Sequence, residues 1–173
     1  MITPAYVQMM AQYNQWQNNN LYKAAATLDD HIRKQESGAW FGSIHATFNH
    51  VIWADRYWLY RFTGSEKPKG GMAESRFIYD DFNDLHAARL ALDNIILNWA
   101  HAVEHDWLIS DLSWFSGSKQ VTVSRPMAQA VTHFFNHQTH HRGQIHALLT
   151  RFSAKPHDTD LIFMTMDDIN SLA

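Results

Sequence analysis

Apolar side chains recur at three- and four-residue intervals over four long stretches of the chain, which is the period of an amphipathic α-helix. The first stretch begins at Thr3 and Pro4, residue types that suit a helix N-cap and the position after it, and it runs to about Gln35. The other three cover approximately residues 40–62, 81–105 and 124–152. Four helices of this length predict an all-α fold, a four-helix bundle.

Breakers of different kinds separate these stretches. Ser37 and Gly38 end the first, and residues 64–71, with two Lys, one Pro and three Gly, predict a solvated loop. Residues 108–123 change character, because β-branched and aromatic residues flank Ser116-Gly117-Ser118, and this pattern predicts a short hairpin. Ser124 is then expected to cap the last helix, with Pro126 in its first turn. In the tail, residues 161–166 are apolar enough to pack back on the bundle.

The composition narrows the class of protein. A chain of 173 residues with 46% hydrophobic residues predicts one domain, spanning residues 1–173, with a core of its own. The absence of Cys excludes disulfides, thiolate nucleophiles and sulfur-ligated metal clusters. A net charge of -3 with scattered Lys and Arg argues against a nucleic-acid partner. Neither a signal-like start nor an 18-residue apolar window is present, so we expect a cytoplasmic protein with no membrane partner.

Two histidines four residues apart are the strongest chemical signal. On a helix, His137 and His141 project about 40° apart and can reach one ion together. Both fall inside the apolar stripe of their helix, formed by Ala130, Phe134, Ile145, Leu148 and Phe152. Imidazoles on a buried face need a hydrogen-bond partner or an ion. The pair is therefore interpreted as part of a metal site, with two hydrogen-bonded core histidines as the alternative.

The other histidines are weaker candidates. His101 and His105 have the same spacing, but they lie opposite the apolar stripe of their helix and are expected to face solvent without a ligand. His133 and His140 flank the stripe of the last helix, where surface positions are favoured over a supporting role beside the metal.

A metal site needs a third protein ligand, because two imidazoles hold a divalent ion weakly. The second helix offers His45 and His50, and its apolar residues form two stripes, with His50 at the centre of one. This helix is therefore expected to be buried on two sides. The pattern alone leaves open whether His50 faces the last helix or is an ordinary core histidine.

Two longer segments carry a resemblance to a known family. They are Phe48-Asn49-His50-Val51-Ile52-Trp53-Ala54-Asp55-Arg56-Tyr57-Trp58-Leu59 and Phe134-Phe135-Asn136-His137-Gln138-Thr139-His140-His141-Arg142-Gly143-Gln144. These segments resemble the DinB family of small metal-binding bundles. The resemblance covers essentially the whole chain, because it also includes Tyr13-Asn14-Gln15-Trp16-Gln17-Asn18, Leu21-Tyr22, the Ser116-Gly117 hairpin and Asp158-Thr159-Asp160-Leu161.

The resemblance implies a four-helix bundle with up-down-down-up topology, usually homodimeric, that carries a divalent metal ion. Nickel or zinc is expected first, and iron or manganese is also compatible. Carried over residue by residue, the metal ligands are His50, His137 and His141. The family's name refers to induction by DNA damage.

The resemblance also implies a class of chemistry. Members of the wider superfamily pass low-molecular-weight thiols such as bacillithiol, mycothiol or glutathione to an electrophile, so metal-dependent thiol transfer is expected, with metal-dependent hydrolysis close behind. A non-catalytic metal-binding, stress-response or dimerisation module is the alternative. The chain lacks the Glu-x-x-His pairs of ferritin-like di-iron proteins and the His-Glu-x-x-His motif of metalloproteases.

Helical spacing and residue type predict roles for four further residues. Tyr57 and Gln144 lie two turns after His50 and His137, so both are pocket candidates beside the open coordination position, with packing as the alternative. Gly143 inside a helix is expected where another helix comes close. Arg142 is expected to form a structural ion pair, with Asp55 as the suggested partner.

Overall fold

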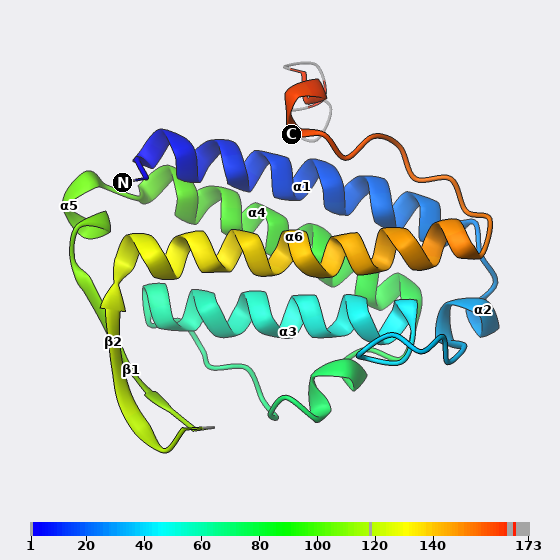
Figure 1. The fold of residues 1–173 in the computed structure, drawn as a ribbon, viewed down its shortest axis with the longest axis horizontal. Helices are drawn as coiled ribbons and strands as arrows, with labels where there is room; N and C mark the ends of the chain where they lie inside the picture. Colours follow the sequence, from blue (N-terminus) through cyan, green and yellow to red (C-terminus); the bar gives the residue numbers. More distant parts are fainter. Residues whose placement is uncertain (1, 118, 166–167, 169–173) are drawn as a thin grey trace.

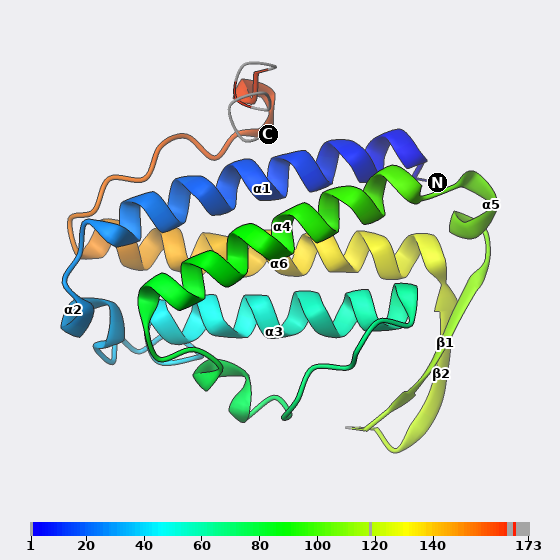
Figure 2. The ribbon, with the colours of Figure 1, turned by 180° about the vertical axis from the view of Figure 1, so that it is seen from behind.

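Four long helices lie side by side in the computed structural model, which describes residues 2–117, 119–165 and 168 (Figure 1). They are α1 (Pro4–Ala26), α3 (Ile44–Thr63), α4 (Phe82–Ala102) and α6 (Met127–Arg151). Both α1 and α3 pack against α4 and α6, so every long helix has two long neighbours. In Figures 1 and 2 the chain runs one way along α1 and α6 and the opposite way along α3 and α4. The chain is thus mostly helical and arranged as a bundle.

The first predicted helix is broken. It ends at Ala26, and a separate short helix, α2 (Asp30–Lys34), follows at a new angle (Figure 1). The side-chain hydroxyl of Thr27 donates to the carbonyl of Ala24 at 2.7 Å, and the guanidinium of Arg33 donates to the carbonyls of Ala25 and Leu28. These bonds satisfy carbonyls that a continuing helix would use. The prediction of one helix to about Gln35 was therefore wrong.

The second helix starts later than predicted. Gly42 has a φ of 92°, a left-handed conformation that ends any helix running from Trp40. Ser43 then acts as the N-cap, with its hydroxyl accepting from the backbone N–H of Ala46 at 3.1 Å. At the other end, Gly64 closes α3 with a φ of 70°. Residues 44–55 are buried without a break, which confirms that this helix is covered on two sides.

The third predicted helix begins where expected but ends earlier. Asp81 is the N-cap of α4, where its carboxylate accepts from the N–H groups of Asn83 and Asp84. The helix ends at Ala102, and His105 begins a separate turn, α5 (His105–Leu108). His101 and His105 thus lie on different helices, and both are exposed, as expected. A 3-10 turn, η1 (Glu74–Phe77), precedes α4 and packs on α3.

The predicted hairpin is present and longer than expected. β1 (Asp111–Ser116) pairs antiparallel with β2 (Val121–Pro126). Ser124 lies inside β2 opposite Ser113, and its hydroxyl accepts from the Ser113 hydroxyl at 3.0 Å. The prediction that Ser124 caps the last helix was therefore wrong, because strand pairing continues to Pro126 and α6 begins only at Met127.

The tail returns along α1 through polar contacts. The Tyr13 hydroxyl donates to the carbonyl of Thr159 at 2.6 Å, and Gln17 donates to that of Asp158 at 3.0 Å. Farther on, Ile162 in η2 (Leu161–Phe163) is 84% exposed, so the expected apolar packing of this segment fails at its centre. Met166 lies outside the described residues.

Buried polar side chains cross the centre of the bundle and join all four long helices. Arg89 on α4 contacts Asp55 on α3 at 2.6 Å and Asp93 at 2.9 Å. All three side chains are at most 2% exposed. Three amides complete the network: Asn14 and Asn18 of α1 donate to Asp93, and Gln138 of α6 donates to Asp55. A polar centre of this kind fixes the relative positions of the helices, because each charge is stable only with its partners in place.

Candidate metal centre

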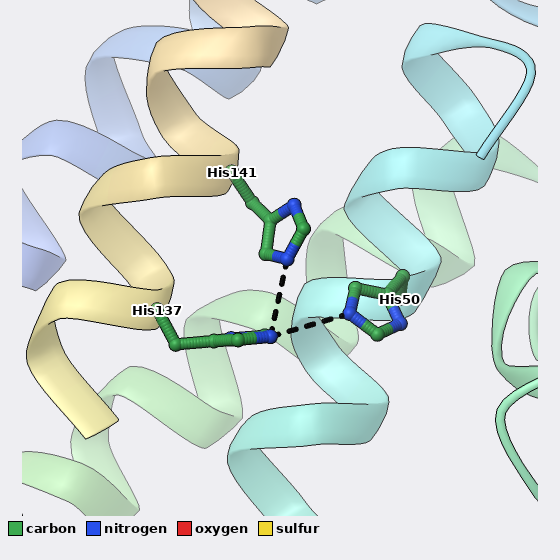
Figure 3. A group of neighbouring side chains, drawn as sticks. All are labelled: His50, His137 and His141. Carbon is green, nitrogen blue, oxygen red and sulfur yellow. Dashed lines mark hydrogen bonds between the residues drawn. The ribbon is translucent and has the colours of Figure 1, made fainter. Parts of the chain in front are cut away.

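Three histidine side chains from two helices converge on one point between α3 and α6 (Figure 3). The Nε2 atom of His137 lies 3.1 Å from that of His141 and 3.4 Å from that of His50. One ligand atom from each residue can be chosen so that all three lie within 4.8 Å of one another. His50 and His141 are 1% and 7% exposed, while His137 is partly exposed. The three residues predicted as ligands are therefore brought together.

These separations suit a divalent ion. Metal–nitrogen bonds of about 2.0–2.1 Å in tetrahedral geometry place two ligand nitrogens about 3.3 Å apart. The two Nε2 separations at His137 fall on either side of this value. Three protein ligands also leave one position for water or substrate, as in catalytic sites.

The ring of His50 is held in the orientation that ligation needs. Its Nδ1 lies 3.0 Å from the hydroxyl of Ser75, which is fully buried in η1. That hydroxyl uses its own proton to bond the carbonyl of Met72 at 2.7 Å, so it accepts from Nδ1–H of His50. The proton is then on Nδ1, and the lone pair of Nε2 faces the other two histidines.

Gln144 fixes His141 in the same way. Its carboxamide oxygen accepts from Nδ1 of His141 at 2.8 Å, and its amide nitrogen lies 3.2 Å from Nε2 of His140. The Nε2 lone pair of His141 is thereby also turned inward. A proton on Nε2 of His137 can point to only one of the two inward nitrogens, whereas a cation at the centre contacts all three. This favours an ion over a hydrogen-bonded trio of core histidines.

Burial keeps the three imidazoles neutral. It lowers the pKa of His50 to about 3, and the neighbouring His141 adds to the effect. Burial and the surrounding histidines likewise lower the pKa of His137 to about 3, and burial lowers the pKa of His141. Neutral imidazole is the form that binds metal, so protons compete weakly at neutral pH.

Two aromatic side chains to which the sequence pattern assigned no role in the site complete it. The ring of Phe41 stacks on His50 with centroids 3.8 Å apart and contacts the edge of His141 at 5.4 Å. Trp53 stacks on His50 at 6.2 Å. Phe41 was predicted to lie in the second helix, but the structure places it in the loop before α3.

Two similarities to known proteins show which family this chain belongs to. The sequence model described as the DinB family matches residues 1–170, which is nearly the whole chain. The chain belongs to the DinB family. Protein DinB of Bacillus subtilis (strain 168) is 28% identical over 166 residues, covering 89% of this chain and 92% of that protein. The family assignment and the three-histidine cluster are both compatible with metal binding.

The remaining candidates occupy other positions in this DinB-family structure. His45 is buried outside the cluster, with Nε2 bonded to the carbonyl of Tyr79 at 2.7 Å. His133 and His140 are exposed, and His133 packs on Trp58 at 5.0 Å. Tyr57 packs on Trp53 at 5.0 Å, so one residue separates it from His50. A role of Tyr57 or Gln144 in binding substrate stays a prediction.

The predictions for two residues of α6, Arg142 and Gly143, were wrong. Arg142 is buried, but it donates to Asn14 and Thr139 and forms no ion pair with Asp55, whose carboxylate is taken by Arg89 and Gln138. Gly143 is exposed, and a Cβ built there meets no atom within 4 Å, so no helix packs closely on it.

No helix among the described residues has the combination of length and apolar character that a membrane span requires.

Proposed function

We propose that this DinB-family protein binds a divalent metal ion, nickel or zinc in the first place and otherwise iron or manganese, through His50, His137 and His141. One observation carries the proposal: the Nε2 atoms of three neutral imidazoles face one another at 3.1 and 3.4 Å, while Ser75 and Gln144 hold the opposite nitrogens of two of the rings. Nitrogen ligands suit each of these ions, so the donor set does not choose among them.

The proposed activity is transfer of a low-molecular-weight thiol to an electrophilic small molecule. A bound ion would activate the nucleophile, because it would lower the pKa of a thiol or water bound to it. The chain contributes orientation: Ser75 and Gln144 hold two of the ligands, and Phe41 covers one face of the His50 ring. Water in place of the thiol gives a hydrolase, and a site closed to both gives a metal-binding or stress-response module without catalysis.

A conjugation assay distinguishes these activities. The metal-loaded protein is incubated with 1-chloro-2,4-dinitrobenzene and each of several thiols, and separately with an activated ester and no thiol. Thiol transfer predicts metal-dependent conjugation that is lost in His137→Ala. Metal-dependent ester cleavage without conjugation favours the hydrolase. Bound metal without turnover in either arm favours the non-catalytic module.

Three further features belong to the same proposal. The up-down-down-up topology is supported by the directions of the four long helices in Figures 1 and 2. A homodimer is proposed from the family resemblance and a cytoplasmic location from the sequence pattern. Sedimentation and cell fractionation test these two proposals.

A further inference from the structure

A cleft of about 470 Å³ lies between α3, α4 and the loop that follows Thr63. Six large apolar side chains line it: Trp53, Leu59, Ile78, Leu92, Ile95 and Trp99. Its volume falls within the range of small-molecule sites, about 300–1,000 Å³, and such sites combine apolar walls with a few polar groups. None of the three clustered histidines lines it.

The polar groups of this cleft carry an excess of positive charge. Arg56, Lys67 and Lys69 line it, against a single carboxylate, Glu66. Within the described part of the chain, none of the three cations lies within 4.0 Å of an acidic oxygen. One Arg56 nitrogen donates to the Tyr79 hydroxyl at 2.8 Å, a neutral acceptor that leaves its charge uncompensated. Three cations without an acidic partner beside an apolar wall are complementary to an anion.

The apolar wall is partly open to water. Ile95 is 55% exposed on α4, whereas Leu92, one turn earlier on the same helix, is 3% exposed. Trp53 joins the cleft to the metal centre, because its indole N–H donates to the carbonyl of Lys69 at 3.2 Å and its ring stacks on His50. Trp53 therefore lines the cleft and also contacts one of the proposed metal ligands.

We propose that this cleft binds a small amphipathic anion, with an aromatic or aliphatic body against Trp53, Ile95 and Trp99 and a carboxylate or phosphate group toward Arg56, Lys67 and Lys69. The site is separate from the histidine cluster, and its occupation does not depend on the metal.

Calorimetric titration of the purified protein tests the proposal with naphthalene probes that differ only in their polar group. We expect 2-naphthoate or 2-naphthyl phosphate to bind at least about tenfold more tightly than neutral 2-naphthalenemethanol, and the tighter of the two identifies the anionic group. The cationic 2-naphthylmethylammonium is expected not to bind. Equal affinity for the anionic and neutral probes, or no binding of either anion, overturns the proposal.

A matched pair of variants locates the site. Ile95→Asp places a negative charge on the wall, and we expect it to weaken binding of the anion at least about tenfold. Leu90→Asp is the control, since Leu90 is 46% exposed on the same helix and does not line the cleft. An equal loss in both variants, with helical circular dichroism retained, contradicts the assignment. Binding that persists in His137→Ala separates this site from the metal proposal.

Discussion

The hydroxyl of Ser75 accepts a hydrogen bond from Nδ1 of His50 at 3.0 Å, across 25 residues of sequence. Ser75 belongs to η1 and His50 to α3, so this contact attaches the segment between α3 and α4 to the metal centre. The bond fixes which nitrogen of His50 carries the proton, and with it the direction of the lone pair available to a metal.

Ser75→Ala is expected to weaken metal binding without removing it. Losing the partner of a ligating histidine typically lowers metal affinity about 10- to 100-fold. Competition with a chromogenic chelator measures the change. Ser110→Ala is the matched control, because the Ser110 hydroxyl bonds the carbonyl three residues earlier, as that of Ser75 does, but contacts no histidine. An affinity unchanged in Ser75→Ala would refute the positioning role.

Gln144→Leu should weaken metal binding to a similar degree, about tenfold or more, because Nδ1 of His141 loses its acceptor. Gln144→Glu keeps an acceptor at this place and is expected to retain wild-type affinity or better. Gln129→Leu, at an exposed position of α6, provides the comparison. If Gln144→Leu and Gln129→Leu have the same affinity, the contact between Gln144 and His141 does not support ligation.

Asp55→Leu is expected to lower the free energy of unfolding by about 3 kcal/mol or more, because removing one partner of a buried ion pair leaves the other uncompensated. Arg89 keeps its contact with Asp93, which places the loss near the lower end of the usual range. Urea denaturation measures it. For comparison, Asp30→Leu breaks surface pairs on a carboxylate that is 51% exposed and should cost less than about 1 kcal/mol. Comparable losses would mean that the central network does not hold the helices together.

The metal-free protein should lose stability as the pH falls from about 6.5 toward 3. His50 and His137 have pKa values lowered to about 3 in the folded state from 6.5. In this interval the unfolded chain takes up protons that the folded chain does not, so acid favours unfolding. His137→Phe removes one of these groups, and its unfolding free energy should therefore depend less steeply on pH. Thermal unfolding in the presence of a chelator, at half-unit pH steps, compares the two proteins.

The helical pattern predicted the four long helices but not where they break. Leu28 and Ile32 continue the apolar spacing of α1, although the chain turns at Thr27. The bonds of Arg33 that stabilise this turn depend on the folded conformation. Ser124 has the chemistry of an N-cap, yet pairing with Ser113 places it in a strand. Hydrogen bonds formed in the folded chain decided both positions, and the apolar spacing does not indicate them.

The candidate site was predictable to different degrees. The apolar stripe of α6 was sufficient to predict that His137 and His141 point inward, because both lie on this one helix. Predicting His50 as a ligand required the family resemblance, because its helix is apolar on two sides and the pattern does not indicate which side faces α6. Ser75 lies in the short 3-10 helix η1 and Phe41 in the loop before α3, and both segments are too short for a period to indicate which side chain points inward. Their contacts with His50 exist only in the folded structure and are not indicated by the sequence pattern.

Metal content of the purified protein and its histidine variants tests the central claim most directly. Measured by inductively coupled plasma mass spectrometry after equilibration with nickel or zinc, wild-type protein should retain one ion per chain. His50→Ala, His137→Ala and His141→Ala should each retain far less. His45→Ala, a buried histidine on the same helix as His50, and His146→Ala, on the same helix as the other two, should match wild type. Equal metal content in all six proteins would contradict a three-histidine metal centre.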